Sequence, residues 1–286
     1  MNELTDWTFT PETIRFSTRD GCELTGDIFT YPSPKYTVLL SSGTGFPRRF
    51  YRHAAAHLAQ KGAMVLTFDY RGIGDSVNEP LKRSTIDYPD WAIDMDAAVE
   101  VLHDRAPDLP LYHLAHSVGG HFIGLMKNHA MIEKHAFVSV GTGYFGGHHF
   151  GHRFLSMYFW WGLGQFSLLR NGYMKPMGGW SGEPLPPQVF KTWRRWSHRR
   201  SYFRPDLLPS GHYEAVTAPI SSWVFDDDPI ATPRSAQDIL DCYPNSPREM
   251  RLRTASDYGL KKVGHVGAFL SGRAPIWDDV WQWLKK

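Results

Sequence analysis

A serine at a strand–helix junction is the first residue of this sequence suited to chemistry. Residues 111–116, LYHLAH, have the apolar and aromatic character of a buried strand, and residues 122–126, FIGLM, carry apolar side chains at helical spacing. Ser117 stands between them, with Ala115 two residues before and Gly119 two residues after. A turn that lifts a serine hydroxyl above a sheet edge is strained and needs small residues at both places. We therefore expect Ser117 to be a nucleophile on a tight turn.

A carboxylate and an imidazole that could activate this serine follow later in the chain. The run Asp226–Asp228 ends the strand-like segment 219–225, and His265 lies in the stretch KKVGHVG. A serine hydroxyl becomes a strong nucleophile when a neutral imidazole takes its proton and a buried carboxylate holds that imidazole. The order Ser117, then aspartate, then His265, each after a strand, is characteristic of one fold.

Strands and helices alternate along most of the chain, which predicts how these groups are positioned. An Asp-Gly pair, Asp20–Gly21, predicts an N-terminal hairpin. The alternation predicts an α/β fold with a mostly parallel sheet and helices on both faces, whose functional groups gather at the carboxyl ends of the strands. Further strands are expected at 35–41, 63–69, 135–140, 219–225 and 249–254, and helices at about 50–61, 91–105 and 233–242, with a terminal amphipathic helix through residues 277–284.

The alternation breaks between residues 141 and 215, which are rich in glycine and tryptophan. We expect an inserted helical lid at 141–215 over a core formed by 1–140 and 216–286, because 75 such residues would hardly form a core of their own. The segment carries 9 Lys and Arg against 3 Asp and Glu. This charge fits either an apolar substrate with an anionic group or a solvated face of arginines.

The remaining composition narrows the classes of protein. A formal net charge of +2 disfavours a nucleic-acid binder. Cys22 and Cys242 predict free thiols in a reducing compartment, and neither a signal peptide nor a run of about 18 apolar residues is found, so a cytoplasmic protein without a transmembrane segment is expected. No cofactor or metal is expected, because His148, His149 and His152 lack a nearby carboxylate or cysteine and predict a surface cluster.

Several motifs together resemble the α/β-hydrolase superfamily. Residues 69–76, DYRGIGDS, match the D-x-R-G-x-G-x-S stretch of that superfamily, residues 228–230 resemble its acid loop, and Gly264–His265 resemble its base loop. The resemblance covers about 13–284 outside the expected lid. Within the superfamily the chain is similar to a group of bacterial predicted hydrolases that share W-R-R-W, here 193–196, and a C-terminal G-H-x-G, for which no substrate is implied.

This resemblance implies a role for each candidate residue. Ser117 would be the nucleophile and His265 the base, whereas His116, beside the serine, would be structural. Asp228 precedes Pro229, where the acid of the superfamily usually stands; Asp227 is the alternative, and Asp226 would cap the loop or face solvent.

Two backbone amides are needed to stabilise the oxyanion formed during attack on a carbonyl. One should belong to Val118, which follows the nucleophile. The second should come from the loop after the strand 35–41. If Ser42–Gly43 corresponds to the usual His-Gly of the superfamily, the second donor is the amide of Thr44. If Thr44–Gly45 corresponds to it instead, the donor is the amide of Phe46.

These residues predict a serine hydrolase that cleaves a small-molecule carboxylic ester or thioester through an acyl-enzyme. An acyltransferase could use the same triad, and a non-catalytic binding protein could retain it. The sequence alone leaves the natural substrate and the oligomeric state open.

Overall fold

One eight-stranded sheet forms the centre of the computed structural model, which describes residues 10–177, 180 and 182–286. The strand order is β1-β2-β4-β3-β5-β6-β7-β8. The pairs β1–β2 and β2–β4 are antiparallel, and all the other neighbouring pairs are parallel. The predicted mostly parallel α/β sheet is therefore confirmed. The strands are β1 (Glu12–Ser17), β2 (Glu23–Phe29), β3 (Tyr36–Ser41), β4 (Ala63–Phe68), β5 (Leu111–His116), β6 (Lys134–Val138), β7 (Ile220–Phe225) and β8 (Arg248–Arg253).

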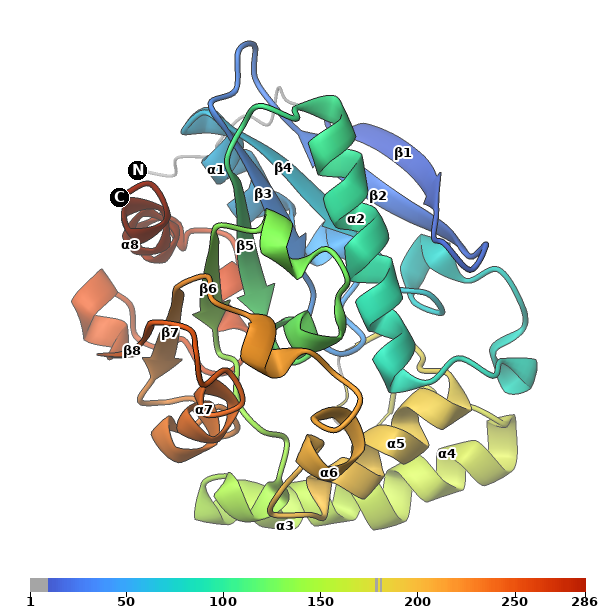
Figure 1. Ribbon diagram of the computed structural model, residues 1–286. Coiled ribbons are helices and arrows are strands. Elements are labelled where there is room, and N and C mark those ends of the chain that lie inside the picture. The colour runs from blue at the N-terminus through green and yellow to red at the C-terminus, as the bar shows by residue number, and fades with distance from the viewer. Residues whose placement is uncertain (1–9, 178–179, 181) are drawn as a thin grey trace.

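Helices cover both faces of this sheet (Figure 1). Along β3, Leu39 packs into the same core cluster as α2 and α7, whereas Val38 and Leu40 pack into the cluster of α1 and α8, because successive side chains of a strand point to opposite faces. The helices are α1 (Arg52–Gln60), α2 (Trp91–Arg105), α3 (Phe150–Met157), a π-helical turn (Tyr158–Leu163), α4 (Gly164–Asn171), α5 (Pro187–Ser197), α6 (Arg204–Leu207), α7 (Pro233–Leu240) and α8 (Ala274–Leu284). Single 3-10 turns lie at Arg48–Tyr51, Gly74–Ser76, Leu81–Arg83, Tyr88–Asp90, Ser117–Gly120, Ile123–Leu125, His129–Met131, Phe145–Gly147, Tyr213–Ala215, Ala255–Tyr258 and Gly267–Phe269.

The helix expected after Ser117 does not form, and isolated 3-10 turns stand in its place. An α-helix would use the carbonyls of Gly120 and His121 to accept its own i+4 amides. Tyrosine hydroxyls from distant segments take these carbonyls instead: Tyr243 donates to Gly120 at 2.8 Å and Tyr213 donates to His121 at 2.9 Å. The helix prediction was therefore wrong. The spacing of apolar residues does not show that distant tyrosine hydroxyls bind the carbonyls that a helix would need.

The chain between β6 and β7 runs across the carboxyl ends of the parallel strands and carries α3 to α6 (Figure 1). The boundaries of the predicted lid, 141–215, stay a prediction. Cys22 and Cys242 are free thiols. Within the described part of the chain, no helix is both long and apolar enough to cross a bilayer.

An ion-pair cluster around the buried Arg48 and Asp69 fixes the loop that follows β3. The backbone amide of Arg48 donates to Asp69 at 2.6 Å, and its guanidinium contacts Asp69, Asp27 at 3.0 Å and Asp75 at 2.7 Å. The carboxylate of Asp69 also accepts the amide of Asp75 at 3.0 Å. The DYRGIGDS stretch thus orders the turn after β4 and ties it to the loop that precedes α1.

Candidate active site

Ser117 begins the turn at the carboxyl end of β5 in a strained backbone conformation. Its φ of +51° lies in the left-handed region, which non-glycine residues rarely occupy outside special turns. Two residues later, a Cβ on Gly119 would lie 2.7 Å from the carbonyl oxygen of Ser41. The backbone of the neighbouring strand therefore leaves room only for glycine at this position, which is the steric reason for the small residue expected there.

Three loop segments from distant parts of the sequence bring the predicted serine, imidazole and carboxylate together. His265 Nε2 lies 3.0 Å from Ser117 Oγ. Its Nδ1 lies 3.0 and 3.1 Å from the two carboxylate oxygens of Asp228. Because Nδ1–H donates a hydrogen bond to the carboxylate, Nε2 carries a free lone pair that can accept the serine proton.

Asp228 is fully buried and held by backbone donors as well as by His265. Its Oδ1 accepts the amides of Ile230 at 2.8 Å and Ala231 at 2.9 Å. Burial raises the pKa of this carboxyl, but the charge of His265, its hydrogen bond and the two amides outweigh burial, so the pKa falls below the ordinary 3.8. Asp228 is consequently ionised at neutral pH.

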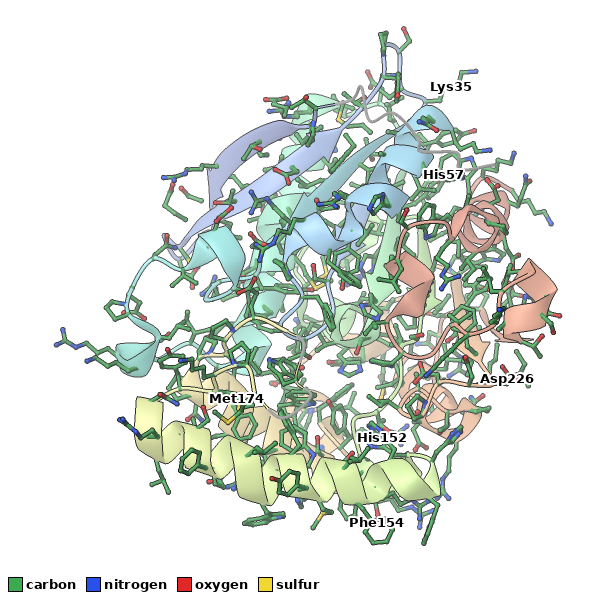
Figure 2. The ribbon with its side chains drawn as sticks, turned by 180° about the vertical axis from the view of Figure 1, so that it is seen from behind. Lys35, His57, His152, Phe154, Met174 and Asp226 are labelled. Atoms are coloured by element: carbon green, nitrogen blue, oxygen red, sulfur yellow. The ribbon has the colours of Figure 1, made fainter. Side chains whose placement is uncertain are left out.

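The other two aspartates of the run have different surroundings. Asp227 accepts the amides of Val263 and Gly264, both at 2.8 Å, and so supports the loop that carries His265. Asp226, labelled in Figure 2, is exposed. The contacts of the three carboxylates thus separate one that touches the imidazole from one that positions its loop and one that faces solvent.

His116 and Tyr51 connect the loop after β3 with the loop that carries His265. The amide of Gly43 donates to the Tyr51 hydroxyl at 2.7 Å, and that hydroxyl lies 2.7 Å from His116 Nδ1. His116 Nε2 donates to the carbonyl of His265 at 2.9 Å, so Nδ1 must accept from Tyr51. Burial, together with the charge of His265, lowers the pKa of His116 to about 3 and keeps it neutral. Sequence reasoning placed His116 as structural but did not reveal this connection.

The two expected oxyanion donors line the same cavity as Ser117. Thr44 and Val118 both border it, and the Thr44 hydroxyl is hydrogen-bonded to that of Tyr88. The amide of Phe46, the alternative donor, already donates to the carbonyl of Gly43 at 3.1 Å. The amide of Thr44 is therefore better suited than that of Phe46 to donate a hydrogen bond to an oxyanion.

A narrow aromatic cavity of about 80 Å³ surrounds the serine hydroxyl. No arginine, lysine or carboxylate stands among the described residues of its wall, so of the two interpretations of the basic segment the wall supports the solvated face of arginines and not an anionic group on the substrate. Sequence reasoning missed most of the wall, although the aromatic clusters of 141–215 were a signal. The lining residues are Thr44, Phe46, Tyr88, Ser117, Val118, His121, Gly141, Gly143, Trp180, Trp193, Tyr202, Ile230 and His265.

The histidines expected to form a surface cluster are only partly at the surface. His148 is 5% exposed, and its Nδ1 lies 3.0 Å from Ser156 Oγ, whereas His149 is exposed. The prediction was therefore wrong for His148, which turns inward from the start of α3. Among the described residues, no group of three or more histidine, cysteine or acidic side chains could hold a metal ion.

Comparisons with known proteins agree with this architecture. Residues 32–162, slightly less than half of the chain, match the family model Hydrolase_4, described as serine aminopeptidase, S33. A comparison with the curated proteins finds no match.

Solved structures resemble the chain over nearly its whole length. It is similar to an esterase from Pyrococcus furiosus, with 17% identity and a TM-score of 0.64 over 98% of this chain and 91% of the other. A soluble variant of monoglyceride lipase from Saccharomyces cerevisiae, in complex with a substrate analogue, has 16% identity and a TM-score of 0.70 over 99% and 98%. The thioesterase domain from the curacin biosynthetic pathway has 13% identity and a TM-score of 0.58 over 96% and 100%. These likenesses, together with the mostly parallel sheet, show that the chain has the α/β-hydrolase fold.

Proposed function

We propose that this chain is a serine hydrolase that cleaves a carboxylic ester or thioester. Ser117 is the nucleophile, His265 is the general base, and Asp228 is the carboxylate that orients His265. The observation that carries the proposal is the continuous hydrogen-bonded chain from Ser117 Oγ through the imidazole to the buried carboxylate, with separations of 3.0 and 3.0 Å. The esterase, lipase and thioesterase named above share this fold, which supports hydrolysis of an ester or thioester.

The proposed reaction follows from the positions of these groups. His265 takes the Ser117 proton as Oγ attacks the carbonyl carbon, and Asp228 stabilises the resulting imidazolium. The amides of Val118 and Thr44 donate to the developing oxyanion, an interaction worth roughly 3 kcal/mol per donor in comparable enzymes. The imidazolium then protonates the leaving alcohol or thiol. Water, activated by His265, hydrolyses the acyl-enzyme and releases the acid.

An aminopeptidase activity, suggested by the description of the matching family model, has less support. A peptidase that trims free N-termini needs an anionic group for the substrate ammonium. The described wall of the cavity contains no carboxylate. We therefore favour uncharged acyl groups over N-terminal aminoacyl groups.

A fluorophosphonate probe followed by intact-protein mass spectrometry tests the proposal. We expect a single adduct that maps to Ser117 in the wild-type protein and no adduct in Ser117→Ala, which should remain folded by circular dichroism. An absent adduct in the folded wild-type protein would overturn the catalytic assignment and favour a binding protein.

Product analysis then separates hydrolysis from acyl transfer. The purified protein is incubated with a short ester or thioester, with and without an added alcohol or amine. Free acid as the main product in both cases supports hydrolysis. An acyl group recovered mainly on the added acceptor would instead identify an acyltransferase that uses the same three residues.

A further inference from the structure

One long helix carries most of the large apolar side chains that the described residues expose. This outer helix, residues 150–171, consists of α3, the π-helical turn and α4 and forms the layer farthest from the sheet (Figure 1). Phe154 projects from it away from the body of the molecule (Figure 2). Clustered exposure of this kind marks an interaction surface rather than chance. The exposed side chains, 57–88% accessible, are Phe150, Phe154, Leu155, Tyr158, Trp161, Phe166 and Leu169.

The π-helical turn keeps these side chains on one face. A spacing of five residues, as between Trp161 and Phe166, would turn Phe166 away from its neighbours in a regular α-helix. The wider turn at Tyr158–Leu163 holds more residues per turn, which reduces the angle between Trp161 and Phe166 around the helix axis. A local departure from α-helical geometry thus narrows the apolar stripe.

The charged side chains of the outer helix and its flanking residues are all cationic. Between residues 141 and 182 the sequence has no aspartate or glutamate, whereas Arg153, Arg170 and Lys175 are present. The guanidinium of Arg194 on α5 lies 4.8 Å from the centre of the Trp161 ring. Apolar side chains bordered by cations, with no acid on the helix itself, are typical of helices that lie in a membrane interface.

The inner face of the same helix reaches the wall of the candidate active site. The ring of Trp160 lies 4.6 Å from that of Trp193, and the ring of Phe159 lies 5.6 Å from that of Trp180. Trp180 and Trp193 both line the cavity beside Ser117. The outer helix therefore separates that cavity from its own exposed apolar face.

We infer that the outer helix docks on a lipid bilayer surface that contains anionic lipids. Its aromatic and leucine side chains would enter the boundary between headgroups and acyl chains, and its arginines and Lys175 would contact the lipid phosphates. A second copy of this chain fits the same face poorly, because a symmetric contact would bring two cationic borders together without a carboxylate from either helix.

Vesicle flotation of the whole 286-residue chain tests this inference. We expect the protein to float with phosphatidylcholine vesicles that contain about 30% phosphatidylglycerol, to float less with pure phosphatidylcholine, and to lose binding as salt is added. The double variant Phe154→Ser/Leu169→Ser should bind the anionic vesicles roughly tenfold more weakly, because it removes two apolar side chains from the lipid contact.

Leu252→Ser provides the matched control, because Leu252 is 59% exposed on β8, outside the outer helix. It should bind vesicles like the wild type, and both variants should retain the wild-type fold by circular dichroism. Equal binding of wild type and double variant, or no binding by the wild type, would overturn the inference. So would a wild-type dimer in gel filtration that the double variant converts to a monomer. Binding is read without turnover, so this result stands apart from the proposed chemistry of Ser117.

Discussion

At the scale of single residues, three adjacent aspartates receive three different roles from their contacts. Asp228 touches the imidazole of His265, Asp227 accepts two amides of the loop that carries this imidazole, and Asp226 is exposed. Their side chains are chemically identical, so only the directions of the loop backbone separate them. The proposed acid is therefore defined by geometry and not by residue type.

Asp228→Asn should lower kcat for ester hydrolysis by roughly 10⁴-fold, because an amide cannot stabilise the imidazolium and favours the wrong tautomer of His265. Asp227→Asn is the matched variant, since its amide oxygen can still accept one of the two loop amides. Its loss in kcat should be much smaller. Steady-state kinetics of both variants check the assignment, and a larger loss in Asp227→Asn would reverse the roles of the two aspartates.

At the scale of elements, the cavity beside Ser117 is closed by side chains from separate segments. Trp193 of α5 and Trp180 from the β6–β7 connection face residues from the loops after β3, β5 and β7. A cavity of about 80 Å³ is small beside the roughly 300–1,000 Å³ of typical ligand pockets. The arrangement of α5 against the core thus limits the acyl group that can reach Ser117.

The wild-type protein should therefore hydrolyse p-nitrophenyl acetate with a higher kcat/KM than the octanoate. Trp193→Leu, which shortens the wall, should shift this ratio toward the octanoate. Trp161→Leu removes a comparable side chain from the exposed face of the outer helix and should leave the ratio unchanged. The prediction fails if acetate and octanoate are hydrolysed equally well by the wild type, or if both variants shift the ratio alike.

At the scale of the whole molecule, the fold buries an unusual number of histidines in neutral form. Burial lowers the pKa of each, to about 3 for His113, about 3 for His148 and about 4 for His121. In the unfolded chain these groups titrate near 6.5. At any pH between the folded pKa and about 6.5, the unfolded state binds more protons than the folded state. The free energy of unfolding is therefore unaffected by these histidines above pH 6.5 and decreases as the pH falls below it. The buried histidines are His113, His116, His121, His135 and His148.

The free energy of unfolding should accordingly fall between about pH 7.5 and pH 5.5, with each buried histidine contributing up to about 1.4 kcal/mol per pH unit below 6.5. His148→Gln removes one of these protons and should therefore reduce the slope by up to about 1.4 kcal/mol per pH unit. Comparison with the wild type cancels the contributions of all other groups, including buried carboxyls such as Asp94, whose raised pKa acts in the opposite sense. Urea unfolding at several pH values measures both slopes, and identical slopes would contradict the prediction.

Local signals in the sequence determined much of this protein. Hydrophobic periodicity and turn residues predicted the alternating strands and helices, because both depend on neighbours a few positions away. The motif around Ser117 predicted a small residue at position 119, although the contact that requires glycine there comes from Ser41 on the neighbouring strand. Membership of the W-R-R-W group stays a prediction.

Only the tertiary structure decided the features that depend on contacts between distant segments. These include which aspartate touches His265, the link through Tyr51 and His116, and the hydroxyls of Tyr213 and Tyr243 that replace a helix with isolated turns. The exposed face of the outer helix belongs to the same class, because its apolar residues look like core residues in the sequence. No local pattern records whether another element covers them.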